Sequence, residues 1–328
     1  MKYLAIDIGG TFTKYAVVTG ACVILEKNKR PTVAEPLDKF IDSIVDIYES
    51  FKGTVDGIAL STAGIIDSEK GFMYTGGNIT CIKNINIVEI LEKRCKVPVT
   101  VENDAKCAAL AEVWKGALKD CKDGIVVVCG TGIGGALIHD KKVLKGIHNM
   151  AGEFSYVITD TQPEFKMDNT FAGNSGIRSL MHMVSKYTNI PENELDGERV
   201  FSMANCGDEN AVRAIREYSR QIAVQINNYQ FIFDPEKIVI GGGISVHPLF
   251  IQMIKEELKK LNAVYPWELP IANIEVCRYY NDANLIGAVY VHIRSKEKRI
   301  DVDKLNELLD MVKDRREGQY LMELLMEK

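Results

Sequence analysis

The chain has 328 residues, of which 46% are hydrophobic and 26% are charged, and its formal net charge is −5 at pH 7. This composition is typical of a globular protein with one large domain or two domains of ordinary size. The acidic balance gives no electrostatic reason to bind nucleic acid or an anionic membrane, so we expect neither as a partner.

The cellular compartment is predicted from features that the sequence lacks. The opening stretch MKYLAIDIGG is too short and, at Asp7, too acidic for a signal peptide, and no run of about 18 apolar residues could span a membrane. The eight cysteines are scattered singly, without a C-x-x-C pair, as is usual for reduced thiols. We therefore expect a cytoplasmic protein.

Two stretches of the chain, 3–18 and 125–138, resemble each other. Each is an apolar run, a turn of glycine and threonine, and a second run without helical periodicity, which predicts strand–turn–strand. A repeat about 120 residues apart indicates a duplicated domain. We therefore expect a first lobe over 1–120 and a second lobe over 121–328.

The remaining elements are predicted from hydrophobic periodicity and from turn residues. Strands that alternate with helices indicate an α/β protein. The amphipathic stretch at 297–328 predicts one or two C-terminal helices. The other helices are expected at 36–51, 85–95, 105–119, 175–187, 209–232 and 247–262, and further strands at 56–61, 98–102 and 237–241.

The first of two glycine-rich turns runs from Asp7 to Thr11 and leads into Thr13 and Lys14. Glycine lets backbone N–H groups approach an anion closely, and hydroxyl groups add donors. The turn is neither a Walker A loop nor a dinucleotide-binding fingerprint, and an ordinary hairpin turn would explain it by itself. A second such turn, at 130–135, favours another interpretation. Two facing turns could hold a polyphosphate between them, and Asp7 could hold a hydrated Mg²⁺.

Polar residues Glu102, Asn103 and Asp104 stand between an apolar strand and an alanine-rich helix. An Asn or Asp at this point can cap the helix by accepting hydrogen bonds from its first N–H groups. Ligands also collect at strand ends in α/β proteins. In a phosphoryl-transfer enzyme, a carboxylate here could orient the attacking hydroxyl and accept its proton. The residues alone leave both interpretations open.

Six motifs, in their order along the chain, resemble those of the ROK family of sugar kinases and repressors. The resemblance covers about residues 3–295 and implies a duplicated, actin-like (ribonuclease H-like) α/β fold with two lobes and an active site in the cleft between them. The motifs are D-I-G-G-T from Asp7, E-N-D from Glu102, G-T-G-I-G from Gly130, A-G-E from Ala151, I-V-I-G-G-G from Ile238 and N-D-A-N-L-I-G-A from Asn281.

The resemblance also implies roles for individual residues, with ATP and Mg²⁺ as cofactors and a homodimer as the assembly. Asp104 would be the general base, and Asp7 would hold Mg²⁺ through water. The residues on the sugar side would be Ala63, Gly64, Asn78, Asn103, Asp104, Glu153 and Tyr156. The residues on the ATP side would be Asp7, Gly9, Gly10, Thr11, Thr13, Lys14, Thr131, Gly132, Gly134, Gly241, Gly242 and Gly243.

One departure from the family pattern concerns zinc. Many members carry A-G-E-x-G-H and C-x-C-G-x-x-G-C, whose histidine and three cysteines bind a structural zinc ion. Here the corresponding stretches, 151–156 and 170–177, keep glycines but contain neither histidine nor cysteine. Because a tetrahedral zinc site needs four such ligands, we expect no structural zinc.

The resemblance implies ATP-dependent phosphorylation of a sugar hydroxyl, commonly the primary 6-hydroxyl of a hexose. A tyrosine at 156, in place of the zinc-binding histidine, favours a β-glucoside with an open pocket at its anomeric end, and free glucose and N-acetylmannosamine are the alternatives. A sugar-responsive regulator and a non-catalytic sugar-binding protein are the other classes. We expect neither, because no DNA-binding module fits before residue 7 and because Asp104 and both turns are intact.

Overall fold

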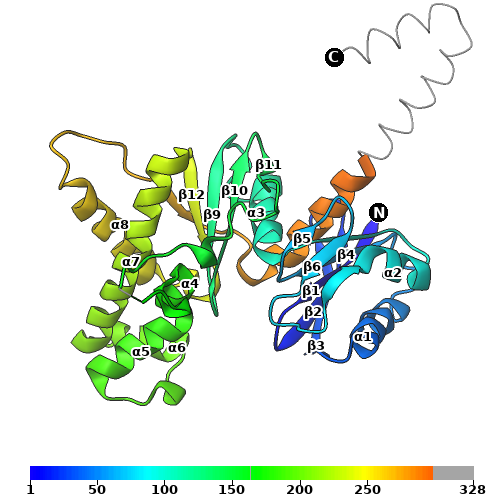
Figure 1. Cartoon of the computed structure of the whole chain (residues 1–328), viewed down its shortest axis with the longest axis horizontal. Coiled ribbons are helices and arrows are strands. Elements are labelled where there is room, and N and C mark those ends of the chain that lie inside the picture. The colour runs from blue at the N-terminus through cyan, green and yellow to red at the C-terminus, as the bar shows by residue number, and fades with distance from the viewer. Residues whose placement is uncertain (163, 298–328) are drawn as a thin grey trace, which may run out of the picture.

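The computed structural model describes residues 1–162 and 164–297, and each half of the chain builds one five-stranded sheet (Figure 1). In the first sheet, in the order β3-β2-β1-β4-β8, β1 pairs antiparallel with β2 and parallel with β4. Its strands are β1 (Lys2–Ile8), β2 (Phe12–Thr19), β3 (Ile24–Pro31), β4 (Ile58–Thr62) and β8 (Val99–Asn103).

The second sheet repeats this arrangement in the order β11-β10-β9-β12-β13. Here β9 pairs antiparallel with β10 and parallel with β12, which in turn pairs parallel with β13. The duplication predicted from the two resembling stretches is therefore confirmed. The strands are β9 (Gly124–Cys129), β10 (Ile133–His139), β11 (Lys142–Val143), β12 (Lys237–Gly241) and β13 (Ile274–Val276).

A small third sheet, which the sequence did not predict, is inserted between β4 and α2 of the first lobe. Its middle strand pairs antiparallel with both neighbours. Two of its strands flank the loop that carries Asn78, so the insertion lies where the sugar side was predicted. The strands are β5 (Ile66–Asp67), β6 (Phe72–Thr75) and β7 (Lys83–Asn86).

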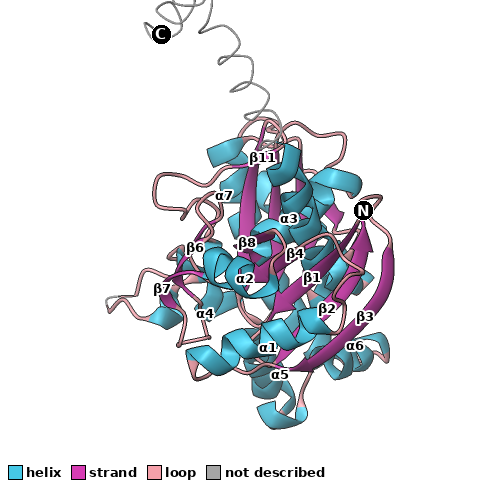
Figure 2. Cartoon of the chain, turned by 90° about the vertical axis from the view of Figure 1, so that its right-hand side faces the viewer, coloured by secondary structure: helices cyan, strands magenta, loops and turns pink. Residues whose placement is uncertain are grey.

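Helices cover the sheets on the faces that carry the apolar side chains. Two of them, α1 and α2, cover one face of the first sheet, as the view of that lobe in Figure 2 shows. All six helices and the strands predicted from periodicity are present, but the helices α4 and α6 and the strands β3, β11 and β13 were not predicted. The labelled α-helices are α1 (Leu37–Glu49), α2 (Ile87–Cys95), α3 (Asp104–Lys115), α4 (Phe171–Ser175), α5 (Ile177–Thr188), α6 (Gly197–Asn205), α7 (Glu209–Phe233) and α8 (Pro248–Asn262).

Two helices pack across the predicted division at residue 120. A helix over 283–297, which the sequence did not predict, lies on the first sheet, where Leu285 and Val289 join the core around Tyr3. Helix α3 contributes Ala109 and Val113 to a core that belongs to the second sheet. The two helices touch so closely that a Cβ atom at Gly287 would lie 1.7 Å from the carbonyl oxygen of Cys107. These helices join the lobes, and the division at residue 120 stays a prediction.

The structure bears on three other expectations. Within 1–162 and 164–297, no helix has the length and apolar character that crossing a membrane requires. All eight cysteines are free thiols, and five of them are buried. The predicted C-terminal helices of 297–328 lie, apart from residue 297, outside the described residues.

Candidate active site

Asp7 stands at the centre of a polar row that crosses the first sheet. In the strand register its neighbours are Lys14 on β2 and Ser61 on β4, and Ser61 lies beside Glu102 on β8. The hydroxyl of Ser61 donates a hydrogen bond of 2.9 Å to Oδ1 of Asp7, and Nδ2 of Asn284 donates another of 3.0 Å to the same oxygen. The second oxygen, Oδ2, lies 3.9 Å from Nζ of Lys14.

The environment of Asp7 has opposing effects on its acidity. Burial raises the pKa of the carboxyl group, while Asn284, Lys14 and Ser61 lower it. With Oδ1 held by two donors, Oδ2 faces away from them toward a cationic side chain. An acidic oxygen in such a position suits a hydrated divalent cation, which prefers oxygen ligands and keeps most of its waters.

The first glycine turn joins β1 and β2. Gly10 and Thr11 are exposed, and their N–H groups lie outside the strand pairing. A Cβ atom at Gly10 would lie 3.9 Å from the side chain of Asn78, so the turn and the predicted sugar loop are neighbours. Thr13 differs from Gly10 and Thr11, because it is buried and its hydroxyl shares a hydrogen bond of 3.0 Å with Thr32. Its position gives no support to a role in ATP binding.

The predicted sugar-binding loops meet at the end of β8. A Cβ atom at Gly64 would lie 2.0 Å from the carbonyl oxygen of Thr75, so only glycine allows the two loops to pack so closely. Nδ2 of Asn103 donates a hydrogen bond of 3.1 Å to the carbonyl oxygen of Gly64. The structure thereby brings Ala63, Gly64 and Asn103 together, with Asn78 exposed beside them.

Asp104 opens α3, but Asn103 is the residue that caps the helix. Oδ1 of Asn103 accepts a hydrogen bond of 3.1 Å from the N–H of Lys106. Asp104 accepts one of 2.8 Å from the N–H of Ala105 and stays partly exposed. Of the two interpretations left open by the sequence, capping therefore belongs to the neighbouring asparagine.

The pKa of Asp104 is raised to about 6. Burial is the largest cause, and the negative charges of Asp7 and Glu153 add to it, while the hydrogen bond from Ala105 opposes it. A carboxylate whose pKa lies close to neutrality can both hold a proton and release it at physiological pH, which is what a general base requires.

The second glycine turn lies close to the start of α3. A Cβ atom at Gly134 would lie 3.0 Å from Cβ of Ala105, the residue after Asp104. The carbonyl oxygen of Gly130 accepts a hydrogen bond of 3.0 Å from the N–H of Ile177, so the turn is fixed against α5. Thr131 at its tip is exposed, and Gly132 is partly exposed.

The glycines that follow β12 lie directly beside the end of β9. Gly242 has a φ of +92°, and a Cβ atom there would lie 1.9 Å from the carbonyl oxygen of Cys129. Gly243 faces open space, with no heavy atom within 4 Å of an added Cβ. The second and third glycine segments of the predicted ATP set are therefore neighbours at one edge of the second sheet.

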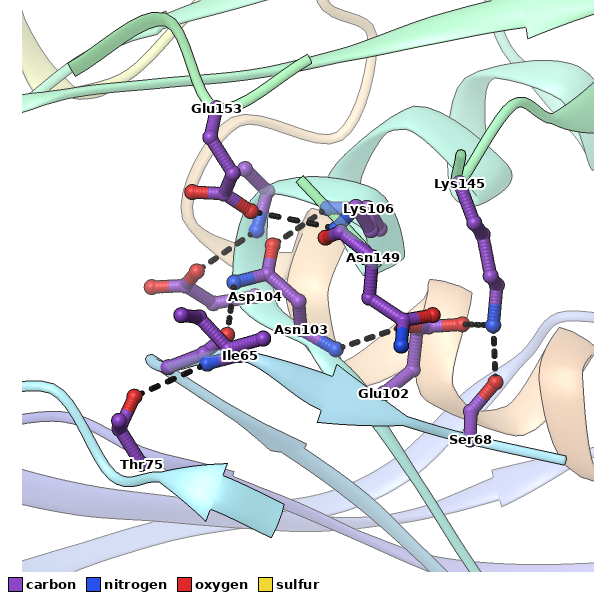
Figure 3. A network of polar contacts seen from close by, with 12 residues as sticks. Ile65, Ser68, Thr75, Glu102, Asn103, Asp104, Lys106, Lys145, Asn149 and Glu153 are labelled. Atoms are coloured by element: carbon purple, nitrogen blue, oxygen red, sulfur yellow. Dashed lines mark hydrogen bonds and ion pairs between the residues drawn. The ribbon is translucent and has the colours of Figure 1, made fainter. Parts of the chain in front are cut away.

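Glu153 is held beside Asp104 by a buried lysine that the sequence interpretation missed (Figure 3). Nζ of Lys106 lies 3.2 Å from Oε1 of Glu153 and donates a hydrogen bond of 2.9 Å to the carbonyl oxygen of Asn149. Lys145, from the same segment, lies 2.8 Å from Oε2 of the buried Glu102. Two lysine–glutamate pairs therefore connect the segment 145–153 to the end of β8 and the start of α3.

An aromatic stack follows Glu153. The ring of Phe154 lies on that of Tyr229 from α7, with centroids 4.2 Å apart, and Tyr229 meets the edge of Phe171 at 6.5 Å. Both phenylalanines belong to the stretches that correspond to the family's zinc motifs. Among the residues that the structure describes, no group of three or more His, Cys, Asp or Glu could hold a metal ion. The side chain of Tyr156, at 57% exposure, faces solvent.

Four residues of this site were not assigned by sequence reasoning: Ser61, Lys106, Lys145 and Asn284. The N-D-A-N motif contained a signal for Asn284, but its partner Asp7 lies at the other end of the chain. A lone lysine among alanines was the signal for Lys106. Ser68, which Lys145 also contacts, carried no signal.

The duplicated fold, the two glycine turns and the carboxylate between them define a two-lobed phosphotransferase of the actin-like class. The model of the ROK family matches residues 3–295, and the chain belongs to this family. It is 31% identical to a β-glucoside kinase of Klebsiella pneumoniae, an alignment that covers 93% of this chain and 100% of that one.

Solved structures agree with this assignment. A ROK family protein from Streptococcus pneumoniae, in complex with sucrose, is 31% identical and covers 91% of this chain and 100% of its own, with a TM-score of 0.80. The fold is shared with a ROK family glucokinase from Streptomyces griseus, solved with glucose and AMPPNP, which is 24% identical at a TM-score of 0.77 and covers 88% of this chain and 98% of its own. The chain is an ATP-dependent sugar kinase.

Proposed function

We propose that this kinase uses Asp104 as the general base and transfers the γ-phosphoryl group of ATP to the 6-hydroxyl of the glucosyl unit of a β-glucoside. One observation carries the assignment of the base. Asp104 stands between Asn103, which contacts the sugar loop at Gly64, and Ala105, which lies beside the second glycine turn, and its pKa is raised to about 6. At neutral pH it is mostly ionised and can accept the proton of the attacking hydroxyl.

The residues around Asp104 would bind the sugar and orient its hydroxyl groups. Asn103 and Glu153 would offer an amide and a carboxylate oxygen to sugar hydroxyls, and Asn78, which lies beside Gly10, would offer a second amide. The backbone of Ala63 and Gly64 would line the pocket. Such positioning supplies much of the rate in phosphoryl transfer, because the protein has little covalent chemistry to perform.

The residues present fit ATP with Mg²⁺. The exposed N–H groups and hydroxyls of the two turns would hold phosphates, with Lys14 as a cation, and the open space at Gly243 would admit the adenosine. Asp7 would hold the hydrated Mg²⁺ through Oδ2, because Oδ1 is taken by two donors. Mg²⁺ would supply charge neutralisation on the phosphates. The phosphate-binding residues would be Gly9, Gly10, Thr11, Lys14, Thr131, Gly132 and Gly134, and the adenosine would lie against Gly241, Gly242 and Gly243.

Three observations support a glucoside over a free hexose, and the first of them favours the β-anomer. The relative from K. pneumoniae is named a β-glucoside kinase, and the structure from S. pneumoniae holds a disaccharide. The ring of Tyr156 is mostly exposed and sits three residues after Glu153, where it could stack on a second sugar or an aryl group. Free glucose and N-acetylmannosamine are the alternatives.

The test compares kcat/KM for cellobiose and an aryl β-glucoside with that for glucose and N-acetylmannosamine. We expect the glucosides to be preferred by at least about tenfold, which corresponds to about 1.4 kcal/mol of transition-state binding. The variant Tyr156→Ala should lose this preference while its kcat/KM for glucose stays unchanged. A tenfold preference for a free hexose would refute the open pocket and leave the kinase assignment standing.

Two further expectations remain proposals. We place the kinase in the cytoplasm, because that is where ATP and sugars taken up by a cell meet. We also propose a homodimer, which sedimentation of the purified chain at several concentrations would test.

A further inference from the structure

Lys106 occupies an unfavourable place for a cation. Its side chain has no exposed surface, and it lies in the first turn of α3, close to the positive end of the helix dipole. A buried charge is costly unless acceptors surround it. Alanine, which occupies four other positions of this helix, would avoid that cost, so the contacts of the lysine must explain its presence.

The contacts of Lys106 all reach one segment of the other lobe. Nζ donates to the carbonyl oxygen of Asn149 at 2.9 Å and lies 3.2 Å from Oε1 of Glu153. Glu153 is 17% exposed at its side chain, so the carboxylate is partly open while the lysine is not. In Figure 3 the carboxylates of Glu153 and Asp104 lie on the same side of the helix start, and a dashed line joins Glu153 to Lys106.

We propose that Lys106 is a positioning residue that fixes the carboxylate of Glu153 relative to Asp104, so that Oε2 of Glu153 faces the sugar. Lys106 and Asp104 are two residues apart in one helical turn, whose start is capped by Asn103. One rigid element therefore sets the place of the base and, through the lysine, of the carboxylate that binds the sugar. The inference rests on the proposed function, since it takes Glu153 to be a sugar ligand.

Other contacts hold the segment of Glu153 when Lys106 is changed. Lys145 lies 2.8 Å from Oε2 of Glu102, and the ring of Phe154 is stacked on Tyr229. Loss of the lysine should therefore free the carboxylate of Glu153 without unfolding the segment. This separates a positioning role from a purely structural one.

The test measures kcat and the KM of both substrates for Lys106→Met, in the full chain. We expect the KM for the sugar to rise at least about tenfold, with the KM for ATP within about twofold of wild type. The matched control is Lys237→Met. Lys237 also contacts one backbone carbonyl oxygen, of Ala117 at 2.9 Å, and one glutamate, Glu275 at 2.7 Å, but lies at the opposite end of β12 from the glycine turn. Both KM values of the control should stay unchanged.

A double-mutant cycle with Glu153→Gln completes the test. If Lys106 acts through Glu153, the double variant should bind the sugar no more than about twofold worse than Glu153→Gln alone. Independent, multiplying effects of the two changes would overturn the inference, and so would equal rises of the KM for sugar and ATP in Lys106→Met. Should Lys106→Met fail to fold, Lys106→Gln, which keeps a donor, takes its place in the cycle.

The role of Glu153 as a sugar ligand and the positioning role of Lys106 can be tested separately. If Glu153→Gln leaves the KM for the sugar unchanged, Glu153 is no sugar ligand and that part of the proposed function is wrong. If Glu153→Gln raises this KM but the lysine variants do not, the proposed function stands and the positioning role of Lys106 is wrong.

Discussion

The two sheets share one strand order but place opposite kinds of residue at the same positions of the register. The first sheet has an acid, a base and a hydroxyl where the second has an apolar side chain and two glycines. The corresponding pairs, with the first sheet named first, are Asp7 and Val128, Lys14 and Gly134, and Ser61 and Gly241.

The difference shows how one duplicated fold supports two tasks. In the first sheet, side chains converge on Asp7 and hold its carboxylate in place. In the second, glycine avoids contacts that are too close, since a Cβ atom at Gly134 would lie 3.0 Å from Cβ of Ala105 and one at Gly241 would lie 2.8 Å from Sγ of Cys277. We therefore propose that the first edge provides charges for catalysis and that the second lets an anion approach the backbone closely.

The largest effect is expected from removing the charge of the proposed base. Asp104→Asn should lower kcat about 10²–10⁴-fold, the usual loss for a general base, and leave both KM values within a few fold. The control is Asp208→Asn, because Asp208 also stands at the start of a helix but accepts hydrogen bonds from Asn210 and Ala211 as its cap. Activity of Asp104→Asn within about threefold of wild type would contradict the assignment.

The same variant should be more stable than wild type above neutrality. The pKa of Asp104 rises from 3.8 to about 6 on folding, so the stability present below pH 3.8 is lost as the pH passes through about 6. Asparagine does not ionise and avoids this loss. We expect the free energy of unfolding of Asp104→Asn, relative to that of wild type, to be about 1–3 kcal/mol higher at pH 8 than at pH 3.5, as measured by urea unfolding. A pH-independent difference would show that Asp104 titrates normally.

The glycines of the second sheet can be separated into structural and functional members. Gly242→Ala should cost at least about 3 kcal/mol of unfolding free energy, because the new Cβ atom would lie 1.9 Å from the carbonyl oxygen of Cys129. Gly207→Ala is the matched control. Its φ of +91° is almost the same, but no heavy atom lies within 4 Å of the added Cβ, so only about 1–2 kcal/mol of backbone strain is expected.

Gly243 completes this series. Gly243→Ala meets open space, so its stability should equal that of wild type. If adenosine lies against this turn, the KM for ATP should rise several fold while the KM for the sugar stays constant. Unchanged kinetics would move the adenosine site away from the turn and leave the structural part of the comparison intact.

The sequence predicted the inner strands of both sheets and β8, because their signals are local, but not β3, β11 or β13. Valine- and isoleucine-rich runs and glycine turns at 3–18 and 125–138 specify strand pairs without reference to the rest of the chain. The small third sheet was not predicted, because β5 has only two residues, which is too short for an alternation of apolar and polar residues to be recognised. The helix over 283–297 was not predicted. Asn284 contacts Asp7 and Gly287 contacts Cys107, and both partners are far away in the sequence, so no local pattern indicates these contacts.

The site shows the same limit. The absence of zinc ligands could be read from two short stretches, but the meeting of Phe154 and Phe171 through Tyr229 depends on a helix far along the chain. Likewise, nothing beside Lys106 in the sequence reveals that its charge reaches Glu153. Contacts of this kind depend on the packing of the two lobes, which no local pattern encodes.

The smallest expected effect concerns the pKa of Asp104, the proposed base. The acid limb of kcat/KM should fall about tenfold per pH unit below pH 6 or so, because only ionised Asp104 accepts a proton. Glu153→Gln removes one of the two charges that raise the pKa of Asp104, so its acid limb should move to lower pH. The shift should be a minor part of the whole rise, since burial is the largest cause and remains.

The control for this shift is Glu257→Gln, which removes a carboxylate that is also paired with a lysine, Lys260 at 2.6 Å, but lies on α8. Its acid limb should coincide with that of wild type. If Glu153→Gln returned the limb to the ordinary range of an aspartate, charge repulsion and not burial would control Asp104. An unmoved limb would mean that the paired charges of Lys106 and Glu153 cancel at Asp104, and the raised pKa would then come from burial and Asp7 alone.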